Sequence, residues 1–113
     1  MTLSATAIRA WLEGGPAPDR TEQRAAVKQT LAAVVAAAPG RSVEIRVPPF
    51  GAVQCVPGLH HGRGTPPNVV EADPRTWLAL AAGVLSWDDA ARSGALLASG
   101  TRAAEVAALL PVL

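Results

Sequence analysis

The amino-acid sequence predicts an α+β fold, because the spacing of its apolar residues changes twice along the chain. Residues 4–38 place apolar side chains every three or four positions, which is the period of a helix, and residues 42–47 place them at every second position, which is the period of a strand. From residue 73 onward the helical spacing returns. A chain of 113 residues has the length of one domain, so we expect residues 1–113 to share a single hydrophobic core.

Two helices are predicted before the first strand. Residues 4–13 carry one apolar stripe, and Ser4 stands where it can cap the start of the helix. Residues 20–38 predict a longer helix, because Asp19 and Glu22 have the spacing of a capping box and a Pro-Gly pair follows the last apolar position. A helix as short as the first one is marginal in water, so we expect it to dock on the rest of the domain.

The middle of the chain predicts three strands. Residues 42–47 alternate apolar and polar side chains, which is typical of a half-buried strand. Residues 48–51 turn the chain, so residues 52–56 predict a second strand antiparallel to the first. Residues 57–67 contain three glycines, three prolines and both histidines, which predicts a loop, and residues 68–71 predict a short third strand.

The second half of the chain returns mainly to helices. One helix is predicted to begin at the Asp73 cap, with proline in its first position, and to end at Gly83. Ser86 is predicted to cap a second, shorter helix. Residues 95–98 are apolar and lie between two glycines, so they predict a buried strand, and Thr101 is predicted to cap a final helix.

Composition excludes several classes of function. Ten basic and nine acidic residues give a net charge of +1, and the basic residues are spread along the chain, which argues against an electrostatic nucleic-acid groove and against a polybasic membrane-docking segment. No apolar run reaches the ~18 residues of a membrane span. The N-terminus lacks the basic region of a signal peptide, so we expect a cytoplasmic protein.

The residues that could carry chemistry form no catalytic or metal-binding motif. Cys55 is the only cysteine, which excludes an internal disulfide, and its place in the second predicted strand indicates a small buried hydrophobe. The adjacent His60 and His61 lack an obvious third metal ligand. Asp88 and Asp89 fall in the first turn of a predicted helix, where negative charge favours the helix dipole. We therefore expect no enzymatic activity, no metal and no cofactor.

Three parts of the sequence resemble a known family. Residues 41–55 (RSVEIRVPPFGAVQC), residues 63–71 (RGTPPNVVE) and residues 76–83 (TWLALAAG), with Trp87 after them, resemble the small actinobacterial sterol carrier family proteins. The pattern of the second half is also similar to the wider sterol carrier protein type two superfamily. The resemblance implies a mainly antiparallel sheet with helices packed over one face. In the lipid-binding members, it further implies an apolar tunnel between these layers.

Two interpretations of the large apolar residues are open. The three tryptophans either fill the core or form the wall of an apolar cavity beside smaller side chains. On the second interpretation, the protein is a non-enzymatic module that holds a lipid or another apolar ligand between the helices and the sheet. His61 and Arg63, in the predicted loop, are then the candidates to hold a polar headgroup, although Arg63 could equally tie the loop to neighbouring carbonyl groups. The predicted lining consists of Phe50, Val53, Trp77, Leu80, Trp87 and Leu96.

The alternative is a structural or protein-interaction module with a filled core. In that case the apolar C-terminal tail, residues 111–113, and the first helix would meet a partner or a second copy of the chain as a homodimer. A third possibility is an accessory role beside a catalytic domain, because some similar domains are fused to thiol-dependent isomerases and acyltransferases. A mobile apolar ligand or a protein is thus the expected partner, rather than nucleic acid or an integral membrane segment.

Overall fold

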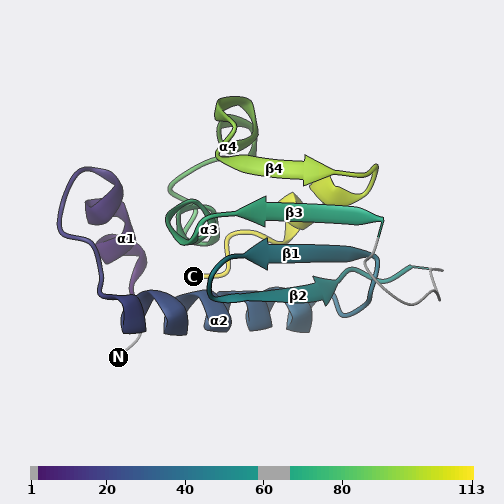
Figure 1. The fold of residues 1–113 in the computed structure, drawn as a ribbon, viewed down its shortest axis with the longest axis horizontal. Coiled ribbons are helices and arrows are strands. Elements are labelled where there is room, and N and C mark those ends of the chain that lie inside the picture. Colours follow the sequence, from purple (N-terminus) through teal and green to yellow (C-terminus); the bar gives the residue numbers. More distant parts are fainter. Residues whose placement is uncertain (1–2, 59–66) are drawn as a thin grey trace.

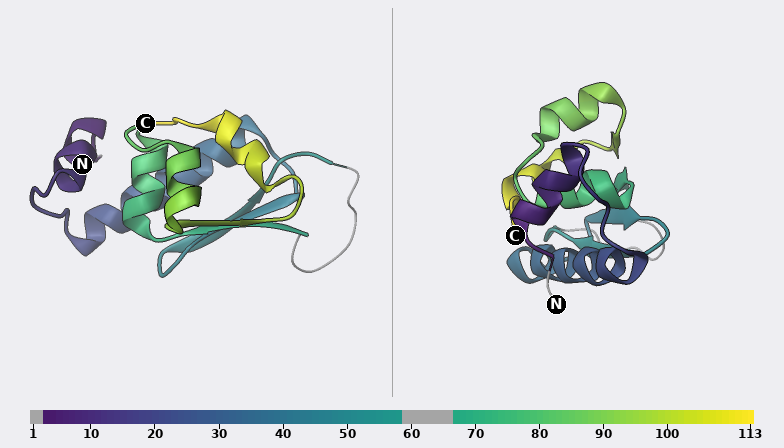
Figure 2. Two further views of the ribbon diagram at one scale, coloured as in Figure 1. Left: turned by 90° about the horizontal axis from the view of Figure 1, so that it is seen from above. Right: turned by 90° about the vertical axis from the view of Figure 1, so that its left-hand side faces the viewer.

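The computed structural model describes residues 3–58 and 67–113, and these form an α+β fold with one sheet. Four strands lie in the order β2-β1-β3-β4, and helices cover one face of the sheet (Figures 1 and 2). The predicted fold class is therefore confirmed. The elements are α1 (Ala5–Leu12), α2 (Arg20–Ala37), β1 (Val43–Val47), β2 (Gly51–Cys55), β3 (Asn68–Ala72), α3 (Pro74–Ala81), α4 (Trp87–Ser93), β4 (Leu96–Ser99) and the 3-10 helix η1 (Ala103–Leu109).

Two of the three strand pairings are antiparallel. β1 and β2 form the predicted hairpin, with Ile45 opposite Val53. β3 then runs parallel to β1, with Ile45 opposite Val70, and β4 returns antiparallel to β3. The sheet is thus mainly antiparallel, with one parallel pair at its centre (Figure 1).

The helix starts that the sequence predicts are confirmed by their capping hydrogen bonds. The Ser4 hydroxyl and the Asp73 carboxylate each accept a backbone N–H from the first turn of their helix, at 3.1 and 2.7 Å. Asp19 and Glu22 form the complete capping box of α2, and the Ser86 hydroxyl caps α4. These bonds satisfy backbone donors that have no partner inside the helix.

The alternation of β1 gives the sheet two different faces. Val43, Ile45 and Val47 are fully buried on the face that the helices cover, whereas Glu44 and Arg46 point to the other face. Figure 2 (left) shows the helices gathered on one side of the strands. We call the side of Glu44 and Arg46 the open face.

A buried polar contact joins the two helices that pack in the middle of the domain. Trp77 of α3 is fully buried, and its indole Nε1 donates to the Thr30 hydroxyl of α2 at 2.8 Å. The same hydroxyl donates to the carbonyl groups of Ala26 and Val27, so no polar atom of this contact is left unpaired. The indole therefore packs in the core without a desolvation penalty.

Two predictions for the C-terminal part are wrong. Residues 95–98 do not form a buried strand, because β4 is an edge strand that buries only Leu96 and leaves Leu97 60% exposed. The last helix is not capped by Thr101. The residue before η1 is Arg102, and its backbone N–H donates to the Asn68 side chain at 3.0 Å. The helix is a 3-10 helix and has no side-chain cap.

No helix in the described ranges is long and apolar enough to cross a membrane. The apolar faces of α2 and α3 are instead turned into the core.

Replacing Thr30 by valine is expected to destabilise the fold. The substitution keeps the shape of the side chain and leaves the buried Trp77 N–H without an acceptor, so the free energy of unfolding should fall by about 1–3 kcal/mol. Urea unfolding followed by tryptophan emission measures this change. The control is Thr21→Val on the exposed side of the same helix, which should change stability by less than ~0.5 kcal/mol. Equal effects of the two variants would contradict the role given to the Trp77–Thr30 bond.

Candidate functional site

An apolar hollow in the helical layer lies where α3, α4 and η1 meet. It has a volume of about 210 Å³, and its wall is completed by the end of the chain. We call it the tail hollow. Its lining consists of Leu80, Gly83, Leu85, Ser86, Trp87, Ala107, Leu110 and Pro111.

The turn between α3 and α4 shapes the floor of the tail hollow. Gly83 has a φ of +75°, a left-handed conformation that suits glycine and ends α3. A Cβ atom at Gly83 would lie 3.4 Å from the Pro111 ring, so the absence of a side chain lets the tail come close. Ser86 then caps α4 and places Trp87 at the first position of that helix, beside Leu80.

The C-terminal tail closes one side of the hollow with few interactions. The backbone N–H groups of Val112 and Leu113 both donate to the carbonyl oxygen of Ala81, at 2.9 and 3.0 Å. This carbonyl is at the end of α3, where no later turn supplies a donor. Pro111 and Leu113 are exposed, so the tail is held mainly by these two hydrogen bonds and the side chain of Val112.

The chemistry of the tail hollow is that of an apolar binding site. None of its lining side chains carries a charge, and the Ser86 hydroxyl is engaged in capping α4 at 3.1 Å. The nearest carboxylates along the chain, Asp88 and Asp89, lie in the first turn of α4. The hollow can therefore accept an apolar group but offers no acid, base or nucleophile.

The structure brings only some of the predicted lining residues together. Leu80 and Trp87 share the tail hollow, whereas Leu96 lines a separate hollow beside β4. Phe50 packs beneath two guanidinium groups at the start of α2, and Val53 is half-buried on β2. His61 and Arg63 lie outside the described residues.

Trp77 and Trp87 correspond to the two different interpretations of the tryptophans. Trp77 is a core residue, since it is fully buried and hydrogen-bonded to Thr30. It lines neither the tail hollow nor the hollow beside β4. Trp87 is half-buried and lines the tail hollow. The tail hollow lies where helices end rather than between α2 and the sheet, and no residue of α2 lines it.

Cys55 has the environment of a structural thiol. Its side chain is fully buried at the end of β2, and burial raises the pKa of the thiol to about 11. The thiol is thus protonated at neutral pH. Only the deprotonated thiolate would act as a nucleophile. Among residues 3–58 and 67–113, no three metal-ligating side chains come together.

The sequence analysis missed several residues of the tail hollow. Leu85, Ala107 and Leu110 line it, and so does Pro111, which the sequence indicated only as part of a partner-binding tail. One signal that could have found them is the apolar pair Val84-Leu85 in a turn between two helix caps. Apolar residues in such a turn are expected to pack against another apolar segment. Residues 111–113 are such a segment, and they belong to no predicted helix or strand.

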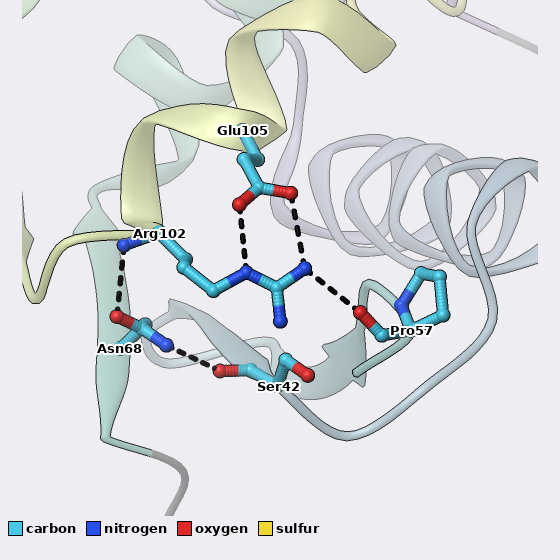
Figure 3. A network of polar contacts seen from close by, with 5 residues as sticks. All are labelled: Ser42, Pro57, Asn68, Arg102 and Glu105. Carbon is cyan, nitrogen blue, oxygen red and sulfur yellow. Dashed lines mark hydrogen bonds and ion pairs between the residues drawn. The ribbon is translucent and has the colours of Figure 1, made fainter. Parts of the chain in front are cut away.

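A polar network holds the other end of the domain together (Figure 3). The Arg102 guanidinium donates to the Pro57 carbonyl at 2.8 Å and pairs with both carboxylate oxygens of Glu105, at 2.7 and 3.1 Å. The Asn68 side chain donates to the Ser42 carbonyl at 2.8 Å and accepts from the Arg102 backbone. Arg102 and Asn68 therefore tie β3 and η1 to the chain on either side of the hairpin.

This network leaves little room for side chains on its glycines. A Cβ atom at Gly58 would lie 2.2 Å from the Ser42 hydroxyl and 2.5 Å from the Arg102 guanidinium. One at Gly100, where φ is +94°, would lie 2.3 Å from the Asn68 side-chain oxygen. The close approach of these backbones is thus part of how the network fits together.

A comparison with protein families supports the sterol carrier resemblance. The family model described as "Bacterial SCP ortholog" matches residues 19–112, which is most of the chain. The chain belongs to this family of bacterial SCP orthologues. The match includes the tail hollow and the Arg102 network and begins at the Asp19 cap, so α1 lies outside the matched part of the SCP ortholog. No curated protein matches the chain.

The pairing of Glu105 with Arg102 should be visible in a titration of this SCP ortholog. The hydrogen bond from Arg102 lowers the pKa of the Glu105 carboxyl below its ordinary value of 4.5. A folded-state pKa below the unfolded value means that the pair stabilises the fold above pH 4.5, and that this contribution is lost as pH falls through the lowered pKa.

The measurement is carboxyl-carbon NMR of the protein and its Arg102→Gln variant. The Glu105 midpoint should lie below 4.5 in the parent protein and should rise in the variant. Arg92→Gln, which removes the exposed partner of Asp89, is the control and should leave the Glu105 midpoint unchanged. A Glu105 midpoint that is the same in all three proteins would contradict the pairing.

Proposed function

We propose that this SCP ortholog is a non-enzymatic carrier that holds an apolar ligand, such as the acyl chain of a lipid, in the tail hollow. The observation that carries the proposal is an uncharged apolar hollow whose outer wall is the loosely held end of the chain. Membership of the bacterial SCP orthologues supports a lipid-binding role. The ligand would enter from the side of the tail and bury its apolar carbons against Leu80 and Trp87.

The energies of the two competing states favour such an entry. The tail is held by two backbone hydrogen bonds, worth about 1 kcal/mol each, and by the partly buried side chain of Val112. Each CH₂ group that a ligand buries contributes ~0.8 kcal/mol, so burial of about three such groups offsets the loss of both bonds. A hollow of about 210 Å³ accepts only part of a long acyl chain, and displacement of the tail would extend it.

The tail that could mediate a structural role is already occupied within the molecule. Residues 111–113 lie against the end of α3, with two hydrogen bonds from their backbone to Ala81. This arrangement supports the carrier proposal over the alternative of an interaction module built on the tail. A cytoplasmic location is a further part of the proposal. Headgroup binding by His61 and Arg63 stays a prediction of the sequence, because both residues lie outside the described part of the chain.

Filling the tail hollow is expected to weaken ligand binding. Ala107→Leu adds three carbons inside the hollow, and the dissociation constant of a fluorescent polyene fatty acid should rise about tenfold or more, because the probe loses two or more buried CH₂ groups. Ala104→Leu on the exposed side of η1 is the matched control and should bind as the parent does. Binding is measured by energy transfer from tryptophan to the probe.

Trp87 provides an independent readout of the location. In Trp87→Phe the probe should still bind, as followed by its own emission, but most of the energy transfer should be lost because the donor that lines the hollow is gone. Equal affinity of the Ala107→Leu and Ala104→Leu variants would place the ligand elsewhere. Failure of the parent protein to bind any acyl probe would overturn the carrier function and favour the interaction module.

A further inference from the structure

The open face of the sheet carries a long trough on the side away from the tail hollow. Three adjoining hollows of about 470, 230 and 350 Å³ follow one another across the strands, and Glu71 of β3 lines all three. The first and second hollows also share Leu97, and the second and third share Pro48. They therefore form one continuous depression from β4 to the turn between β1 and β2.

The end of the trough beside β4 is apolar and unusually exposed. Leu97 is 60% exposed. Among the described residues it is one of two large apolar side chains that are exposed, and the other is Leu113. Val69 stands on the neighbouring strand, opposite Ser99, and faces the same side. Leu97 and Val69 together give this end of the trough an apolar floor.

The outer edge of β4 adds main-chain groups to this surface. Within the described part of the chain, β4 pairs only with β3, and it forms the end of the sheet. In an antiparallel ladder, backbone groups point alternately to the two sides of a strand, so β4 presents donors and acceptors outward. Ala91 of α4 lines the same hollow, and α4 lies beside β4 in Figure 1.

The charges of the trough select the type of partner. In the two hollows beside β4 the charged lining residues are Glu71 and Asp73, both acidic. Arg46, in the third hollow, forms an ion pair with Glu44 and also stands opposite Glu71 on the neighbouring strand. One guanidinium group thus faces the two carboxylates of Glu44 and Glu71, and Asp73 adds a third carboxylate farther along the trough. This half of the trough therefore carries a negative excess over an apolar floor.

We propose that this edge of the sheet is a docking site for an extended segment of a partner protein that carries apolar side chains and a Lys or Arg. The segment would lie along β4 as an added strand and form main-chain hydrogen bonds with its outer edge. A basic residue opposite Leu97 would lay its aliphatic stem over that side chain and bring its charge to Glu71, which is directly opposite Leu97 on β3. The added strand would lie two strand spacings, ~9.6 Å, from β3, a distance that a Lys or Arg side chain and the Glu71 side chain can span together.

The same charges argue against the other occupants of this surface. A second copy would bring an identical acidic excess to the trough, and its like charges would repel. An anionic lipid headgroup would be repelled in the same way. A basic extended peptide satisfies the apolar surface, the strand edge and the carboxylates together.

The test uses two synthetic pentapeptides, Val-Thr-Lys-Thr-Val and Val-Thr-Glu-Thr-Val, acetylated and amidated at their ends. Amide NMR of the full chain should show shifts at residues 96–99 with the lysine peptide, and its dissociation constant should be about fivefold lower than that of the glutamate peptide. Leu97→Lys should abolish the preference and weaken binding. Ala36→Lys, on the exposed side of α2, is the control and should bind as the parent does.

Several outcomes would overturn the proposal. These are equal affinity for the two peptides, no shifts at residues 96–99 with either peptide, and shifts confined to other elements. Concentration-dependent dimerisation that Leu97→Lys abolishes would instead assign the edge to a second copy. Because Leu97 is exposed, the variant should stay folded, and unchanged binding of the fluorescent fatty acid would show that a loss at this edge is separate from the carrier function.

Discussion

The alternation of apolar and polar residues in β1 is the constraint on which the rest of the structure depends. Because side chains of a strand point to opposite faces in turn, Val43, Ile45 and Val47 must all be covered on one side, and Glu44 and Arg46 must stay near water on the other. β1 lies inside the sheet, between β2 and β3, so its neighbours inherit the same division through their register. The helices therefore gather on a single face.

This one-sided cover also determines where space remains. The core between α2 and the sheet is filled by side chains with no exposed area, among them Val27, Val34 and Trp77. Close packing of such a layer leaves room only where helices end and a turn replaces side chains. The tail hollow is such a place, since it forms where Gly83 ends α3 and Ser86 begins α4. The trough on the open face exists for the complementary reason, that no helix of residues 3–58 and 67–113 covers it.

The local features could be predicted from the sequence, whereas features set by long-range pairing could not. The caps at Asp19 and Asp73 depend on neighbouring residues alone, and both were predicted correctly. The exposure of β4 depends on its place at the edge, which is set by pairing with β3 and not by its own apolar sequence. The part of Pro111 in the tail hollow likewise depends on where the tail meets Gly83, nearly thirty positions away in the chain. Leu80 and Trp87 share a hollow because they stand on either side of one short turn.

α4 is an element that borders both candidate sites. Trp87, at its first position, lines the tail hollow, and Ala91, one turn later, lines the hollow beside β4. The helix has only seven residues and is tied to the body largely through Ala90 and its contacts with β4. A ligand that moves Trp87 outward would thus also move Ala91, which lines the hollow beside β4. Since coupling between two sites is reciprocal in free energy, a peptide that favours one position of α4 would change the affinity for the apolar ligand by the same factor. A carrier built in this way would link the filling of its hollow to the protein that it docks on.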